Sequence, residues 1–97
     1  MPVIEPLHTQ IIKISQTMMG SVVLENPEGF PRDESNLYCI GHNNEMVWQA
    51  EKPESSGLYS RVMLNENGDT LSAYATTGQA CEIDLMSGNL ISQVKIK

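Results

Sequence analysis

The chain has 97 residues, 40% of them hydrophobic and 19% charged, which is the composition of one small globular domain and not of a disordered segment. Its net charge of −6 disfavours binding to nucleic-acid phosphates and to anionic membrane surfaces, whereas it would attract a basic protein partner. We therefore expect a single domain over residues 1–97, in which residues 1–8 form a less ordered amino-terminal arm.

The sequence at the amino terminus lacks the basic and apolar regions of a signal peptide. No run approaches the roughly 18 apolar residues that a membrane-spanning helix requires. The two cysteines, Cys39 and Cys81, lie within apolar runs, so we expect buried, reduced thiols in a cytoplasmic protein. A disulfide between them is the alternative.

The first half of the chain predicts strands and not helices. Its opening apolar run carries three β-branched isoleucines, which lose rotamer freedom in a helix and fit a pleated strand. A glycine turn leads into the next strand, and a loop with two prolines, which cannot donate to a ladder, separates this pair from a second one. The four strands predicted here are residues 9–17, 21–25, 36–41 and 45–51.

The second half alternates apolar and polar residues between glycine turns, which is typical of half-buried strands. The strands predicted here are residues 58–65, 70–75, 79–85 and 90–96. Asn-Gly is the strongest short hairpin signal, because both residues tolerate positive φ. The predicted hairpin turns are Asn43-Asn44, Asn67-Gly68, Thr77-Gly78 and Gly88-Asn89.

About eight short strands joined largely by tight turns predict an all-β fold, an antiparallel up-and-down meander. To bury one face, such a ribbon closes as a small barrel or folds into a two-layer sandwich. A domain of this size has a thin core, so a second copy that covers part of its surface would stabilise it. We therefore expect a homodimer.

One predicted hairpin resembles the strand pairs of quinoprotein-like propeller blades. The matching residues are Leu37, Tyr38, Asn44, Val47 and Trp48. A weaker echo of the pattern lies 34 residues later, with Glu82 where the tryptophan would stand. Two units are too few to close a propeller, so the resemblance implies a style of hairpin and no activity.

A second resemblance covers most of the chain. It is carried by the order of short motifs: Ile-x-Lys-Ile, Ser-Val-Val-Leu, Asn-Leu-Tyr-Cys-Ile, Val-Trp, Leu-x-Ala-Tyr and Ile-Asp-x-x-x-Gly. This order is similar to that of a group of short, uncharacterised bacterial proteins, some of which are carried on mobile elements such as integron gene cassettes. The resemblance implies no activity for any residue.

The sequence offers no motif for catalysis, a metal or a cofactor. The best metal ligands are His8, Cys39, His42 and Cys81, and no two of them have the spacing of a zinc site. A cysteine paired with a histidine would also need an oriented base and an oxyanion hole, which no predicted element supplies. The glycines are isolated turn residues and form no phosphate-binding loop. We expect no metal, no cofactor and no enzyme activity.

The candidate binding residues are mostly aromatic. Trp48 either fills the thin core or lines a ligand pocket or subunit interface. Strict alternation places Tyr59, Arg61 and Met63 on one strand face, opposite the apolar one, and this composition is typical of interface hot spots, although a solvated face can share it. The full set of candidates is Tyr38, Trp48, Tyr59, Arg61, Met63 and Tyr74.

These observations favour a non-catalytic binding protein that acts through a protein–protein interface, for example as an adaptor or as an immunity-type protein that neutralises a basic toxin. The alternative is a protein that holds a small apolar molecule in an aromatic-lined pocket. A small enzyme is the third possibility, and the missing catalytic motif disfavours it.

Overall fold

The computed structural model describes residues 4–53 and 57–96, and this part of the chain contains strands but no helix. All eight predicted strands are present, and their ends lie close to the expected positions. The strands are β1 (Ile11–Thr17), β2 (Gly20–Glu25), β3 (Leu37–Ile40), β4 (Met46–Gln49), β5 (Tyr59–Leu64), β6 (Thr70–Ala75), β7 (Gln79–Asp84) and β8 (Leu90–Lys95).

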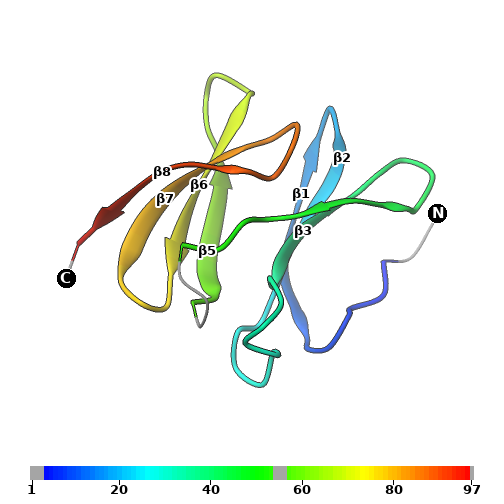
Figure 1. Cartoon of the computed structure of the whole chain (residues 1–97). Helices are drawn as coiled ribbons and strands as arrows, with labels where there is room; N and C mark the ends of the chain where they lie inside the picture. The colour runs from blue at the N-terminus through cyan, green and yellow to red at the C-terminus, as the bar shows by residue number, and fades with distance from the viewer. Residues whose placement is uncertain (1–3, 54–56, 97) are drawn as a thin grey trace.

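Strands that follow one another in the chain pair antiparallel, in two four-stranded sheets ordered β1-β2-β3-β4 and β5-β6-β7-β8. Figure 1 shows the two sheets side by side. The predicted meander is confirmed, and of its two possible closures the sandwich is correct and the barrel is wrong. The ribbon divides after Ala50, the last residue that bonds to β3, and Pro53 beyond it has no N–H for a ladder.

The predicted hairpin turns are confirmed by the backbone. Positive φ angles occur at Asn44 (69°), Gly68 (75°), Gly78 (95°) and Gly88 (75°). In the Asn67-Gly68 turn only the glycine has positive φ. The Asn67 side chain instead accepts hydrogen bonds from the N–H groups of Asp69 (2.9 Å) and Thr70 (3.2 Å), so it closes the turn as a cap.

The core lies between the facing surfaces of the two sheets. The first sheet and its end contribute Val22, Leu24, Leu37, Cys39, Trp48 and Ala50, and the second contributes Tyr59, Val62, Leu71, Ala73, Ala75, Cys81, Ile83 and Leu85. The indole N–H of Trp48 donates to the Leu85 carbonyl at 2.8 Å. Trp48 is therefore a core residue that joins the sheets. Both cysteines are free and buried in this core.

A buried asparagine fastens the second sheet to the first. Asn36, which has no exposed surface, donates through its side-chain amide to the carbonyls of Glu25 (2.7 Å) and Tyr59 (2.6 Å). Its side-chain oxygen accepts from the N–H of Tyr59 at 2.8 Å. The start of β5 thus obtains from a side chain the hydrogen bonds that a neighbouring strand would otherwise supply.

The sheets pack through opposite faces. Along a strand, successive side chains point to opposite faces of the sheet, and successive backbone groups bond to the neighbouring strands on alternate sides. Because all residues are L-amino acids, the residues on one face all bond toward the same neighbouring strand. In β3, the core-facing Leu37 accepts from Ala50, which continues β4 (2.8 Å). In β7, by contrast, the backbone N–H of Asp84 donates to Asn89, beside β8 (2.9 Å). The core-facing residues of β7, Cys81 and Ile83, alternate with Asp84 and therefore bond toward β6. The second sheet therefore packs against the first through its opposite face, so that the two sheets are stacked front to back, as successive units of a repeat are.

This relation defines a structural correspondence between the two sheets as whole units. The hairpins β3–β4 and β7–β8 correspond, and their matched residues, 43 or 44 positions apart, are Ile40 with Ile83, Asn44 with Gly88, and Gln49 with Gln93. The turns differ by one residue, since Asn44 donates to Gly41, three positions back (2.9 Å), and Gly88 donates to Asp84, four positions back (2.8 Å). Both units of the echo at 34 residues are antiparallel hairpins, β3–β4 and β6–β7, but they hold different places in their sheets, third and fourth strands in one and second and third in the other.

Candidate functional site

The six candidate binding residues separate into two groups. Tyr38, Trp48 and Tyr59 are buried, and they do not meet in a pocket. Arg61, Met63 and Tyr74 lie on the outer face of the second sheet, where the register brings Arg61 opposite Tyr74. The structure therefore brings together three of the six residues.

The prediction that Tyr59 shares a face with Arg61 and Met63 is wrong. The pairing of β5 with β6 shifts between Tyr59 and Arg61, so Ser60 is an extra residue in a β-bulge. The bulge turns Tyr59 into the core, where its hydroxyl donates to the Glu51 carbonyl at 2.5 Å. Strict alternation could not reveal this, because a bulge changes the phase of the pattern.

The outer face of the second sheet, which we call the open face, is a surface of two side-chain rows. The rows are Arg61, Tyr74, Ala80 and Val94, and Met63, Ser72, Glu82 and Ser92. Its large apolar members remain exposed, at 60% for Met63, 45% for Tyr74 and 62% for Val94. Exposed apolar side chains that gather on one sheet face are a feature of binding surfaces.

The open face corresponds to the face that the first sheet buries in the core. Matching the hydrogen-bond directions and registers pairs Tyr74 with Leu24, Ser72 with Val22, Ala80 with Leu37 and Glu82 with Cys39. The second sheet thus carries serine and glutamate where the first sheet carries valine and cysteine. This replacement keeps the face hydrated while it is uncovered.

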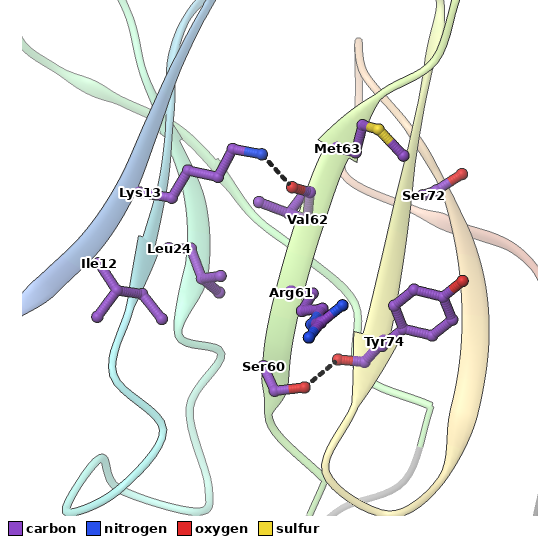
Figure 2. Close-up of a pocket in the computed structure, with 9 residues that line it drawn as sticks. All are labelled: Ile12, Lys13, Leu24, Ser60, Arg61, Val62, Met63, Ser72 and Tyr74. Atoms are coloured by element: carbon purple, nitrogen blue, oxygen red, sulfur yellow. Dashed lines mark hydrogen bonds between the residues drawn. The ribbon is translucent and has the colours of Figure 1, made fainter.

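A pocket of about 430 Å³ opens where the edge of the first sheet meets β5 (Figure 2). It is lined by Ile12, Lys13 and Leu24 from the first sheet and by Ser60, Arg61, Val62, Met63, Ser72 and Tyr74 from the second. The pocket opens beside one end of the open face and shares four residues with it. Sequence reasoning missed Ile12 and Lys13, because no local pattern shows that side chains of β1 reach toward β5.

Two cations reach this pocket, and none of its described lining residues is acidic. The Lys13 ammonium donates to the Val62 carbonyl at 2.7 Å on the unpaired edge of β5, which leaves two of its N–H donors available. The Arg61 guanidinium has no hydrogen-bond or ion-pair partner among the residues that the structure describes. In Figure 2 it extends beside the Tyr74 side chain.

The centre of the outer face of the first sheet, around Val23 and Tyr38, is buried, and the segment that precedes β1 bonds there, whereas Ile14 at its β1 side stays 45% exposed. The Glu25 carboxylate accepts from three consecutive N–H groups of that segment, those of Leu7 (2.6 Å), His8 (3.1 Å) and Thr9 (2.8 Å). It also accepts from the Tyr38 hydroxyl. Sequence reasoning missed this cluster, since a glutamate at a strand end gives no sign of burial.

Burial and hydrogen bonding act in opposite directions on Glu25. Burial raises the pKa of this carboxyl, but the donors from Tyr38, Thr9, Leu7 and His8 outweigh it, so the net pKa is lowered. The pKa of Tyr38 is raised, by burial first and then by the bond to the carboxylate. Glu25 therefore stays ionised, and its acceptor positions are occupied by the protein itself.

Neither cysteine has the setting of a nucleophile. Burial raises the pKa of the Cys39 and Cys81 thiols, so both stay protonated near neutral pH. Within residues 4–53 and 57–96, no group of three or more histidine, cysteine, aspartate or glutamate side chains could hold a metal ion.

The chain matches no protein-family model, no curated protein and no solved structure. In the part of the chain that the structure describes, no helix is long and apolar enough to cross a membrane.

Proposed function

We propose that this chain is a non-catalytic binding protein that holds a protein partner on the open face. The supporting observation is the repeat relation between the sheets. The first sheet uses the corresponding face to bury its core against the next sheet, whereas the open face has no cover in the described chain. On the other side of the molecule, Val23 and Tyr38 have no exposed surface, because the centre of that outer face is covered.

The composition of the open face favours a partner that binds and dissociates. A permanent interface is more apolar, like a core cut in half, whereas Arg61, Ser72 and Glu82 are compatible with the free state. Met63 and Tyr74 supply the apolar and aromatic anchors. The net charge of −6 attracts partners that are basic overall.

The non-catalytic part of the proposal is supported by the state of the reactive groups. Both thiols are buried, and the buried carboxylate of Glu25 is saturated with donors. The described lining of the pocket has no cysteine, histidine or carboxylate beside its cations. Such a constellation can position a charged group, and it lacks the paired nucleophile and base of a catalytic site.

Site-specific photo-crosslinking in the producing cell tests the proposal. A photoreactive residue at Val94, on the open face, should give one discrete protein adduct, and the additional change Tyr74→Lys should abolish it. The same residue at Glu66, which is exposed in the β5–β6 turn, is the control. An adduct of twice the chain mass would identify a second copy as the partner. No adduct from position 94, or the same adducts from both positions, would refute the proposal.

A further inference from the structure

The pocket beside β5 has a chemistry that the proposed protein interface does not use. We infer that it binds a ligand in which an anionic group, preferably a carboxylate, is attached to an aliphatic or aromatic group. The inference rests on the proposed function only where the group belongs to a partner chain, because the pocket opens onto the open face. A free small molecule that carries the same group is the other source.

The pocket is positively charged. The chain has six basic residues against twelve acidic ones, yet two of the basic ones, Lys13 and Arg61, line this one pocket without a described acidic neighbour in its lining. Each has donors that the protein does not use. Two uncompensated cations at one pocket attract an anion over roughly a Debye length, even on a molecule that is acidic overall.

The two cations lie at equivalent positions of the two sheets. Lys13 lies opposite Leu24 in the first sheet, and Arg61 lies opposite Tyr74 in the second, so both occupy the same register position of the repeat. The bond to the Val62 carbonyl (2.7 Å) holds the Lys13 ammonium on β5, the strand that carries Arg61. The pocket lining thus includes a held cation, at the edge of β5 that faces the first sheet, and a free guanidinium, which extends beside Tyr74 on the open face (Figure 2).

The other lining residues favour a ligand with an apolar group next to its charge. Ile12 is 49% exposed and Met63 is 60% exposed, and both line the pocket, as Tyr74 does. Covering these groups favours a ligand that carries aliphatic or aromatic carbon next to its charge. The volume of about 430 Å³ suits a small molecule or one or two side chains.

The site is suited to one negative charge and not to a polyphosphate. No series of backbone N–H groups from a glycine-rich loop or helix is present in the described pocket lining. Glu82 lies on the next strand, opposite Ser72, and would repel a second or third charge that extended over the open face. A planar carboxylate matches the fork of the guanidinium.

Nuclear magnetic resonance titration of the intact protein tests the inference. The probes are 3-phenylpropionate and its neutral amide, together with the dipeptide acetyl-leucyl-phenylalanine as the free acid and as the amide. We expect both acids to shift the resonances of Arg61, Tyr74 and Ile12, and to bind about tenfold more tightly than their amides. Tighter binding of the dipeptide acid would indicate a partner chain as the source, and tighter binding of phenylpropionate would indicate a small molecule.

Variants separate the pocket from general charge effects. Arg61→Gln should weaken binding of the acids about tenfold, and Lys13→Met should also weaken it, whereas Lys95→Gln, an exposed cation on β8, should leave it unchanged. The dispersed amide spectrum of each variant shows that it is folded. No shift with any acid up to about 5 mM, equal binding of acid and amide, or equal binding by wild type and Arg61→Gln would overturn the inference. Crosslinking from position 94 does not depend on these results, so the two proposals can fail separately.

Discussion

Gly68 and Gly88 adopt the same backbone conformation in different surroundings. Both have a φ of 75°, which strains any residue with a Cβ. A Cβ on Gly68 would meet no atom within 4 Å, whereas a Cβ on Gly88 would lie 2.7 Å from the Trp48 ring. The two turns therefore separate the cost of the conformation from the cost of displacing the indole.

We predict that Gly68→Ala lowers the free energy of unfolding by about 1 kcal/mol, which is the strain of positive φ. Gly88→Ala should lower it by about 3 kcal/mol, because the indole must also move away from Leu85. Urea denaturation of both variants measures the difference. Equal losses would mean that the Trp48 ring adjusts without cost.

Glu25 links the covered face of the first sheet to pH. Its pKa is lowered in the folded protein, so it contributes stability that is fully present above its unfolded pKa, about 4.3, and is lost as the pH falls through the folded value. Glu25→Gln should lower the free energy of unfolding at pH 7 by about 2–4 kcal/mol, since an amide cannot accept all of the donors. The exposed Glu28→Gln is the control.

The role of Glu25 can also be tested by the pH dependence of stability. Between pH 6 and pH 3 the wild type should lose stability more steeply than Glu25→Gln, which lacks the titrating group. Denaturation at several pH values, with hydrogen exchange of Leu7, His8 and Thr9 as a local readout, distinguishes the two. Parallel pH profiles for the two proteins would show that the carboxylate does not hold this segment.

At the scale of elements, β5 depends on a side chain and not on a second neighbouring strand. Asn36→Ala removes three hydrogen bonds and leaves the N–H of Tyr59 buried and unpaired. We predict a loss of about 3 kcal/mol in the free energy of unfolding, with faster hydrogen exchange along β5 than along β7. Asn89→Ala, at an exposed position, is the comparison. A loss of less than about 1 kcal/mol would mean that water replaces Asn36 in this role.

The strands and turns could be predicted from sequence because their causes are local. Positive φ at Asn44 or Gly78 follows from residue type, and alternation in β7 separates Cys81 and Ile83 from Glu82. The bulge in β5 is equally local, but Ser60 has no distinguishing chemistry, so the phase of Tyr59 was predicted wrongly.

The candidate site could be predicted only in part, because its remaining determinants are contacts between distant elements. Arg61, Met63 and Tyr74 were identified by their exposed strand positions. Lys13 reaches the same pocket through a contact 49 residues away in the chain, with the Val62 carbonyl. The front-to-back order of the sheets, which leaves the open face uncovered, likewise depends on which face of each sheet is buried.

At the scale of the whole molecule, each sheet completes the other. The largest core side chains come from both sheets, and Trp48 and Asn36 bond across the boundary. A four-stranded sheet with one apolar face must cover that face, and neither sheet does so alone. Unfolding should therefore be a single cooperative transition, as in repeat proteins whose units depend on their neighbours.

We predict that a peptide of residues 57–97 is unfolded on its own, although it contains every strand of the second sheet. Its circular dichroism should be that of a random coil, because the faces of Leu71 and Ile83 would lie in water. Adding a peptide of residues 1–56 should restore the strand signal, and Trp48→Ala in that peptide should prevent the restoration, since the indole fills the boundary. A native-like amide spectrum of residues 57–97 alone would instead show that the second sheet folds independently, with the first sheet as an attachment to it.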